Sequence, residues 1–151
     1  MSSDLRELYQ SVILDHNKRP RNFRKPECAN RSAEGINPLC GDQLVVYLTI
    51  EDGVVEDVGF NGTGCAISTA SASLMTQSIK GKKIEDVEHL FAGFHQMVTS
   101  SPQASTGGED LGKLSVFSGV REFPMRVKCA TLAWHAMSEA LRDTGEIAST
   151  E

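Results

Sequence analysis

The sequence lacks the features that would direct it to a membrane, a secretory pathway or a nucleic acid. No apolar run approaches the ~20 residues that a membrane-spanning helix needs. The opening MSSDLRELYQ has no apolar stretch of the kind found in a signal peptide. The net charge of −5 disfavours binding to nucleic acid. We therefore expect a cytoplasmic protein with no membrane and no nucleic-acid partner.

The spacing of the cysteines excludes an ordinary zinc finger. The four cysteines are Cys28, Cys40, Cys65 and Cys129, and no two of them form a CxxC pair. Because thiols stay reduced in the cytoplasm, disulfides are not expected there. We interpret these cysteines as metal-binding or reactive residues instead.

Length and composition indicate one globular domain. The 151 residues are 40% apolar and 23% charged, which is ordinary for a chain that buries a continuous core. No internal repeat or low-complexity tract divides the chain. We expect a single domain over residues 1–151.

Apolar residues recur at helical spacing in four parts of the chain. These are a segment ending before Pro20, residues 66–79 closed by Gly81, a stripe from Ile84 to Phe94, and a segment from Pro124 to about Asp143. Alanine and serine dominate residues 66–79, which predicts close packing of that helix against another element.

A β-hairpin is predicted between the first two helices. Segments 43–50 and 54–60 are rich in β-branched and aromatic residues, and Glu51-Asp52-Gly53 between them is a strong turn signal. Residues 21–39 and 99–110 lack a clear period and are predicted as loops. The order of elements indicates an α+β domain, in which helices pack on one side of a small antiparallel sheet.

Three cysteines stand at predicted element boundaries. Cys40 precedes the first strand, Cys65 precedes a helix, and Cys129 is expected in the first turn of the last helix. Free backbone N–H groups at such places lower the pKa of a thiol. Asp42 follows Cys40 after one glycine, so it could complete a tetrahedral metal site with the three thiolates. On spacing alone, the alternative is that the cysteines are small buried apolar residues.

Four stretches resemble the IscU/NifU family of iron–sulfur cluster assembly proteins. They are LYQSVILDHNKRPRNF at 8–23, CGD at 40–42, GCAISTASASLM at 64–75 and VKCATLAWHA at 127–136. The resemblance covers most of the chain. It implies that the metal ligands of the family fall on Cys40, Asp42, Cys65 and Cys129.

Two departures resemble the SufU branch of that family. Lys128 stands where scaffold-type members carry a histidine, and there is extra sequence around residues 99–120. SufU proteins are zinc-binding sulfur acceptors for a pyridoxal-phosphate cysteine desulfurase. The resemblance thus implies bound Zn²⁺, a SufS-like desulfurase as partner, and a downstream cluster scaffold or carrier. Cys40 would be the nucleophile that accepts persulfide sulfur, and Arg126 and Lys128 would offset the negative charge of the site.

Two other functions stay open at this point. One is a scaffold on which a [2Fe–2S] cluster is assembled and transferred, since three thiolates and a carboxylate can also hold a cluster. The other is a zinc-stabilised interaction protein with no turnover.

The remaining polar and aromatic residues of note are assigned no part in the cysteine site. Cys28 lies outside every motif and is expected to be a free thiol. Core packing is expected for His16 and Trp134. His89, His95 and His135 are not expected to be ligands, and the glycines at 62 and 64 are expected to form a bend rather than a phosphate loop.

Overall fold

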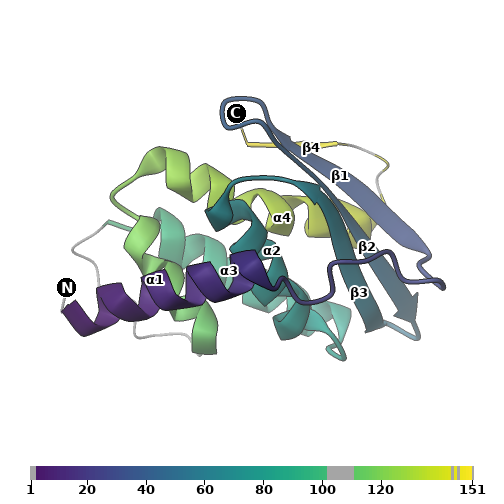
Figure 1. Ribbon diagram of the computed structural model, residues 1–151. Coiled ribbons are helices and arrows are strands. Elements are labelled where there is room, and N and C mark those ends of the chain that lie inside the picture. The colour runs from purple at the N-terminus through teal and green to yellow at the C-terminus, as the bar shows by residue number, and fades with distance from the viewer. Residues whose placement is uncertain (1–2, 102–110, 144, 146, 151) are drawn as a thin grey trace.

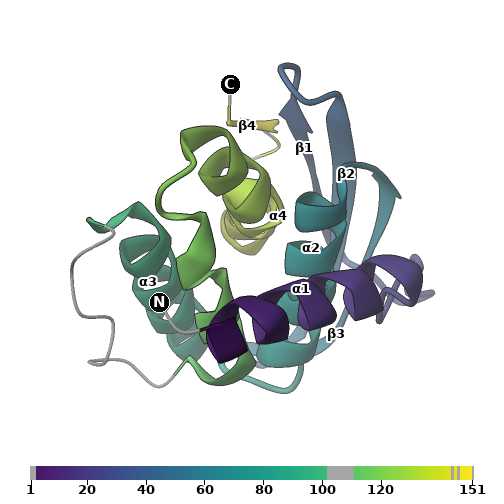
Figure 2. The same ribbon diagram turned by 60° about the vertical axis from the view of Figure 1, so that its left-hand side comes forward.

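The sheet has four strands, and the helices lie against one of its faces (Figure 1, Figure 2). The computed structural model describes residues 3–101, 111–143, 145 and 147–150, with side chains from residue 7 onward. In chain order the elements are α1 (Ser3–Lys18), β1 (Arg31–Asn37), β2 (Asp42–Glu51), β3 (Val54–Thr63), α2 (Ala66–Ile79), α3 (Ile84–Thr99), the 3₁₀ helix η1 (Gly112–Val120), α4 (Pro124–Arg142) and β4 (Ala148–Ser149). This arrangement confirms the predicted α+β class.

The predicted hairpin is formed by β2 and β3, which pair antiparallel. Asp52 and Gly53 have φ values of 52° and 75°, the left-handed conformation that a tight hairpin turn requires. Both strands are longer than predicted. At the far end of β3, Gly62 has φ of 128°, and a Cβ there would lie 2.2 Å from the carbonyl oxygen of Gln43. A glycine at this position therefore lets β3 approach β2 closely just before the chain turns into α2.

The loop predicted over residues 21–39 is wrong for 31–37, which form β1. The segment reads RSAEGIN and has only one β-branched residue, so it carries little local strand signal. Its inward positions are small because α4 packs directly on them. A Cβ on Gly35 would lie 3.2 Å from the Cβ of Ala136. Pairing with β2 and burial under α4 stabilise the strand, and neither is a local property.

One edge of the sheet differs from the antiparallel arrangement expected. The strand order is β3-β2-β1-β4, and β4 pairs with β1 in parallel. β4 is two residues long and follows α4, so the end of the chain returns to the sheet edge beside the first strand (Figure 1). The sheet is therefore mixed.

The alanine- and serine-rich helix α2 lies in the middle of the helical layer, in contact with α1, α4 and β3 (Figure 2). Most of its residues are buried. Ser71 donates a hydrogen bond to the carbonyl of Ala130 and accepts one from the indole of Trp134 at 3.1 Å. Small side chains allow the neighbouring helices to approach, so the predicted close packing is confirmed.

The other helices also follow the predicted segments. α4 begins at Pro124 and is followed by Asp143 in a left-handed conformation. His16 and Trp134 are 3% and 0% exposed, which confirms that both are core residues. Residues 102–110 of the predicted loop lie outside the described part of the chain. No described helix is both long enough and apolar enough to cross a membrane.

Candidate metal centre

Residues from three parts of the chain meet at one end of α2. Cys40 lies on the turn between β1 and β2, Asp42 opens β2, and Cys129 lies on α4. Ligand atoms of these three residues are all within 4.8 Å of one another, and the sulfurs of Cys40 and Cys129 are 3.3 Å apart. Cys65 joins them through Asp42, with its Sγ 3.8 Å from Oδ2. The four residues singled out by sequence are thus neighbours.

A tight turn places Cys40 and Asp42 on the same side. The amide of Cys40 donates a hydrogen bond to the carbonyl of Asn37 at 3.2 Å. Gly41 has φ of 72°, and a Cβ there would meet nothing within 4 Å, so backbone conformation rather than crowding favours glycine. Cys40 is half-buried, whereas Asp42 and Cys129 are buried. Cys40 is therefore the more accessible of the two close thiols.

Cys65 is the N-cap of α2, as its place in the sequence predicts. Its Sγ accepts a hydrogen bond from the amide of Ser68 at 3.4 Å. A hydrogen bond from the thiol of Cys129 and the bond from Ser68 lower the pKa of Cys65 to about 7. Burial and the nearby Asp42 carboxylate oppose this shift. Without a metal, Cys65 is therefore the thiol that ionises most readily of this pair.

The position expected for Cys129 in the first turn of α4 is wrong. α4 begins at Pro124, so Cys129 is its sixth residue, and its amide belongs to the internal hydrogen-bond ladder of the helix. Cys129 therefore does not supply one of the free N–H groups at the start of α4. Its hydrogen bond to Cys65, burial and its contact with Cys40 raise the pKa of Cys129. The two thiols thus differ in acidity mainly because Cys129 donates the hydrogen bond that Cys65 accepts, and to a smaller extent because Cys65 also accepts from the amide of Ser68.

Asp42 supplies a test of whether a cation fits this site. Its side chain is 2% exposed, and Oδ1 accepts a hydrogen bond from the amide of Cys65 at 2.8 Å. Within the described ranges, no lysine, arginine or histidine forms a salt bridge with it. A buried carboxylate without a positive partner is costly. A metal cation held by this carboxylate and the adjacent sulfurs would remove that cost, so the donor set fits a metal.

Asn37 contacts the site and was missed by sequence reasoning. It is fully buried, and its Nδ2 donates to Cys129 Sγ at 3.8 Å, a long contact. Its Oδ1 accepts a hydrogen bond from the amide of Leu39 at 3.2 Å, which helps to form the Cys40 turn. In the sequence, Asn37 is visible only as a polar residue just before Pro38. Its contact with the site follows from β1, which places the side chain of residue 37 inward.

The two cations next to Cys129 do not touch the ligand set directly. Arg126 is exposed, and its guanidinium lies 4.3 Å from the centre of the Phe123 ring. Lys128 is half-buried. In the part of the chain that the structure describes, neither forms a hydrogen bond or salt bridge to a thiol or to Asp42. Their predicted contribution is therefore limited to longer-range charge.

The residues set aside on sequence grounds lie away from this group. Cys28 is exposed and is not part of the cluster. His95 and His135 lie next to each other, with ring centroids 5.7 Å apart, in the lining of a separate cavity between α3 and α4.

Comparisons with known proteins place the chain among iron–sulfur assembly proteins. Residues 8–143 match the family model of the NifU-like N terminal domain. The chain is 38% identical over 140 residues to the iron–sulfur cluster assembly scaffold protein IscU of Streptococcus pyogenes serotype M1, covering 93% of this chain and 86% of that protein. It is 40% identical over 142 residues to the zinc-dependent sulfurtransferase SufU of Bacillus subtilis, covering 93% of each.

A solved structure is also similar. It is described as a candidate iron–sulfur cluster assembly scaffold protein for the SUF system, from Fervidobacterium islandicum AW-1. The TM-score is 0.78 at 34% identity, covering 89% of this chain and 97% of that one.

Proposed function

The chain belongs to the family of the NifU-like N-terminal domain, and from this we propose that it is a zinc-dependent sulfurtransferase of iron–sulfur cluster assembly. It accepts persulfide sulfur from a pyridoxal-phosphate cysteine desulfurase and passes it to a downstream scaffold or carrier. The observation that carries this proposal is the cluster of two adjacent thiols and a buried carboxylate that forms no salt bridge with any described residue, with Cys40 as its accessible member.

The donor set supports zinc as the resident metal. Cys40, Cys65, Cys129 and Asp42 offer three sulfurs and one oxygen, a combination and number that suit tetrahedral Zn²⁺. Zinc, when bound, keeps its cysteine ligands deprotonated at neutral pH. Thiolate is the reactive form in sulfur transfer. Asp42 is a harder ligand than the sulfurs, which favours a site that can release one of its thiolates.

The transfer step is a thiolate exchange at sulfur. The Cys40 thiolate attacks the terminal sulfur of the persulfide carried by the partner's cysteine. A new S–S bond forms on Cys40 while the S–S bond of the donor breaks, and the electron pair leaves with the partner's cysteine as a thiolate. The step needs no added oxidant or reductant, because one persulfide is consumed for each one formed. Cys40 suits this role because it is half-buried on a turn, whereas Cys129 is buried within a helix.

Exposed apolar side chains near the thiols support docking of a partner protein. Leu39 precedes Cys40 and is 60% exposed, and Met125 lies one helical turn before Cys129 and is 45% exposed. Large exposed apolar residues of this kind are buried in many protein interfaces. A SufS-like desulfurase is the partner expected for a sulfur acceptor that operates in the cytoplasm.

A scaffold for a [2Fe–2S] cluster is the second candidate. It is supported by the match to the Streptococcus pyogenes IscU over 93% of this chain. Sulfur acceptance ranks first because Lys128 precedes Cys129 where scaffold-type members carry histidine. A protonated lysine cannot bind a metal, so this substitution removes a possible ligand and adds a positive charge.

The test is turnover of the cognate cysteine desulfurase with and without the zinc form of this protein, followed by trapping and mass analysis of persulfides. We expect zinc-dependent acceleration and one added sulfur on Cys40. Cys40→Ser should give the rate of the desulfurase alone. Cys28→Ser is the matched control, because Cys28 is exposed and outside the cluster.

Full acceleration by Cys40→Ser would overturn the role given to Cys40. Absence of acceleration by the wild-type zinc form would overturn sulfur acceptance. Cluster reconstitution would then be the experiment that tests the scaffold function.

A further inference from the structure

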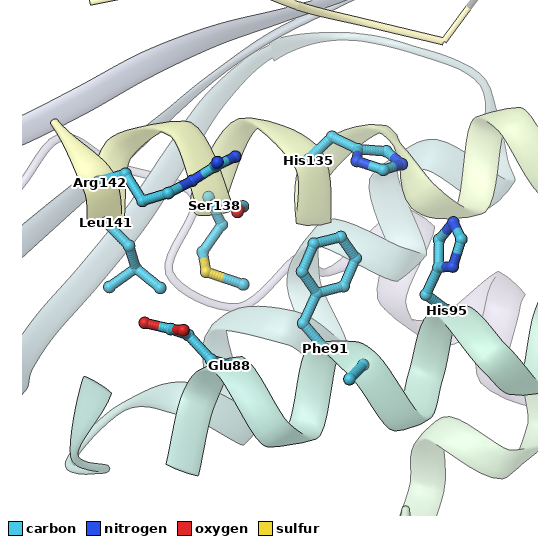
Figure 3. A pocket seen from close by; sticks show the side chains of 9 residues that line it. Glu88, Phe91, His95, His135, Ser138, Leu141 and Arg142 are labelled. Atoms are coloured by element: carbon cyan, nitrogen blue, oxygen red, sulfur yellow. The ribbon is translucent and has the colours of Figure 1, made fainter. Parts of the chain in front are cut away.

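A second group of possible metal ligands lies between α3 and α4, away from the cysteines. The two helices border a cavity of ≈ 460 Å³, and His95 of α3 and His135 of α4 line one part of it (Figure 3). No cysteine is among the lining residues. His135 follows Cys129 by six residues, which is about 9 Å along the helix axis.

The two imidazoles are held at a spacing that suits one shared ion. Their ring centroids are 5.7 Å apart with an interplanar angle of 79°, and Figure 3 shows the rings turned toward each other. With metal–nitrogen bonds of about 2.0–2.1 Å, an ion lies about 3.2 Å from each ring centre. Two such rings at a tetrahedral or trigonal angle are then about 5 to 5.5 Å apart. The two rings meet edge to face, so one ring must rotate before both nitrogens face a single ion, and His95 is exposed and free to do so.

Phe91 packs against both imidazole rings. Its ring meets His95 at 6.0 Å and His135 at 5.3 Å between centroids, both edge to face. It also stacks on Trp134 at 5.8 Å, so it is tied to the core of the domain. Packing of this kind limits the rotamers of His135 and keeps both rings at the same end of the cavity.

The protonation state of His135 allows it to bind a cation, although Arg142 also lines the cavity. Burial, and to a lesser extent the adjacent His95, lower the pKa of His135, so its ring is neutral and able to donate a lone pair at neutral pH. The carboxylate of Glu139, one turn further along α4, is close enough to oppose that shift and adds negative charge. Glu139 is itself hydrogen-bonded to Arg142 at 3.1 Å.

We propose that His95 and His135 form a second metal site, distinct from the cysteine cluster, which takes a late first-row divalent cation through two imidazole nitrogens. Imidazole suits Zn²⁺, Ni²⁺ and Cu²⁺ better than it suits Mg²⁺ or Ca²⁺. Water fills the remaining coordination positions, since the cavity is open and has room for it.

The test uses Ni²⁺ as the probe and the zinc-loaded protein, so that the cysteine site is already filled. Binding of a further equivalent is followed by calorimetry, and the zinc content is measured before and after. Imidazole resonances identify the ligands: paramagnetic Ni²⁺ should broaden those of His95 and His135 before those of His16 and His89. A thiolate-to-nickel absorption band would reveal binding at the cysteines instead.

Three variants complete the design. His95→Gln and His135→Gln should each weaken Ni²⁺ binding by at least about tenfold. Loss of a residue that only hydrogen-bonds to a metal ligand already lowers metal affinity by about tenfold or more, and loss of the ligand itself should lower it at least as much. His89→Gln is the matched control, because His89 is an exposed histidine of α3 that does not line the cavity. His95 is exposed, so His95→Gln leaves the fold intact and is decisive alone. No additional Ni²⁺ bound, or equal affinity in His95→Gln and wild type, would overturn the proposal.

Discussion

Asn37 ties the turn that carries Cys40 to the helix that carries Cys129. Its amide nitrogen reaches the sulfur of Cys129, and its amide oxygen holds the backbone of Leu39. A side chain that contacts both segments carrying the candidate ligands helps to hold the ligands at a fixed distance, although it does not bind the metal itself. Asn37 is therefore a positioning residue of the candidate metal centre.

We predict that Asn37→Ala releases zinc to a chelator faster than wild type and lowers the free energy of unfolding by about 1–3 kcal/mol, because a buried hydrogen-bonding group is lost. Asn30→Ala is the matched control. It also removes an asparagine that makes two hydrogen bonds, both to the backbone of Ile50, but far from the thiols along β2.

Chelator competition and urea unfolding measure the two effects. If Asn37→Ala and Asn30→Ala release zinc at the same rate, Asn37 has no positioning role at the metal centre.

At the scale of elements, α1 docks on α2 through a buried histidine. His16 Nδ1 and Ser73 Oγ are 2.7 Å apart, and the amide of Arg21 donates to the same oxygen at 2.8 Å. The hydroxyl has one proton and two acceptor sites, so it can accept from Arg21 and still donate its own proton to an unprotonated Nδ1 of His16. Burial first, and then the charges of Arg21 and Lys113, lower the pKa of His16 below its ordinary value of 6.5, against the effect of Asp15.

This predicts a pH-dependent stability of the α1–α2 contact. The unfolded state binds more protons than the native state, so the contribution is complete above about pH 6.5 and is lost as pH falls below that value. We expect wild type to lose more free energy of unfolding between about pH 7.5 and about pH 5.5 than His16→Gln does.

Urea unfolding of the metal-free proteins at the two pH values measures the difference. Equal losses in wild type and His16→Gln would show that His16 does not contribute to the pH dependence.

For the whole molecule, the candidate metal ligands connect parts that the apolar core also connects. They come from the β1–β2 turn, the start of β2, the N-terminus of α2 and the second turn of α4. The core is separate and continuous, with Phe60, Phe94, Phe117 and Trp134 among its largest fully buried side chains. The fold therefore does not depend on the metal alone.

We predict that removing zinc leaves the domain folded with a lower melting temperature. A metal that binds only the native state at 1,000 times its Kd stabilises it by about 4 kcal/mol. Far-UV circular dichroism and thermal melts with and without chelator test this. Loss of helical signal at about 25 °C on zinc removal would instead favour a zinc-stabilised interaction protein.

Local patterns in the sequence determined the four long helices, the β2–β3 hairpin and the four residues of the cysteine cluster. Helical periodicity, the Asp52-Gly53 turn and the proline at position 124 act over a few neighbouring residues, so they can be interpreted without the fold. The candidate ligands were suggested by motifs of the same short range, and the resemblance to a family favoured this interpretation over buried apolar cysteines.

Tertiary structure alone decided what depends on contacts between distant segments. β1 exists because β2 pairs with it and α4 covers Gly35, and the parallel edge exists because the end of the chain returns to β1. The 3.3 Å approach of Cys40 to Cys129 and the facing rings of His95 and His135 join elements far apart in sequence. Such pairings are set by packing of the whole domain, and no local spacing encodes them.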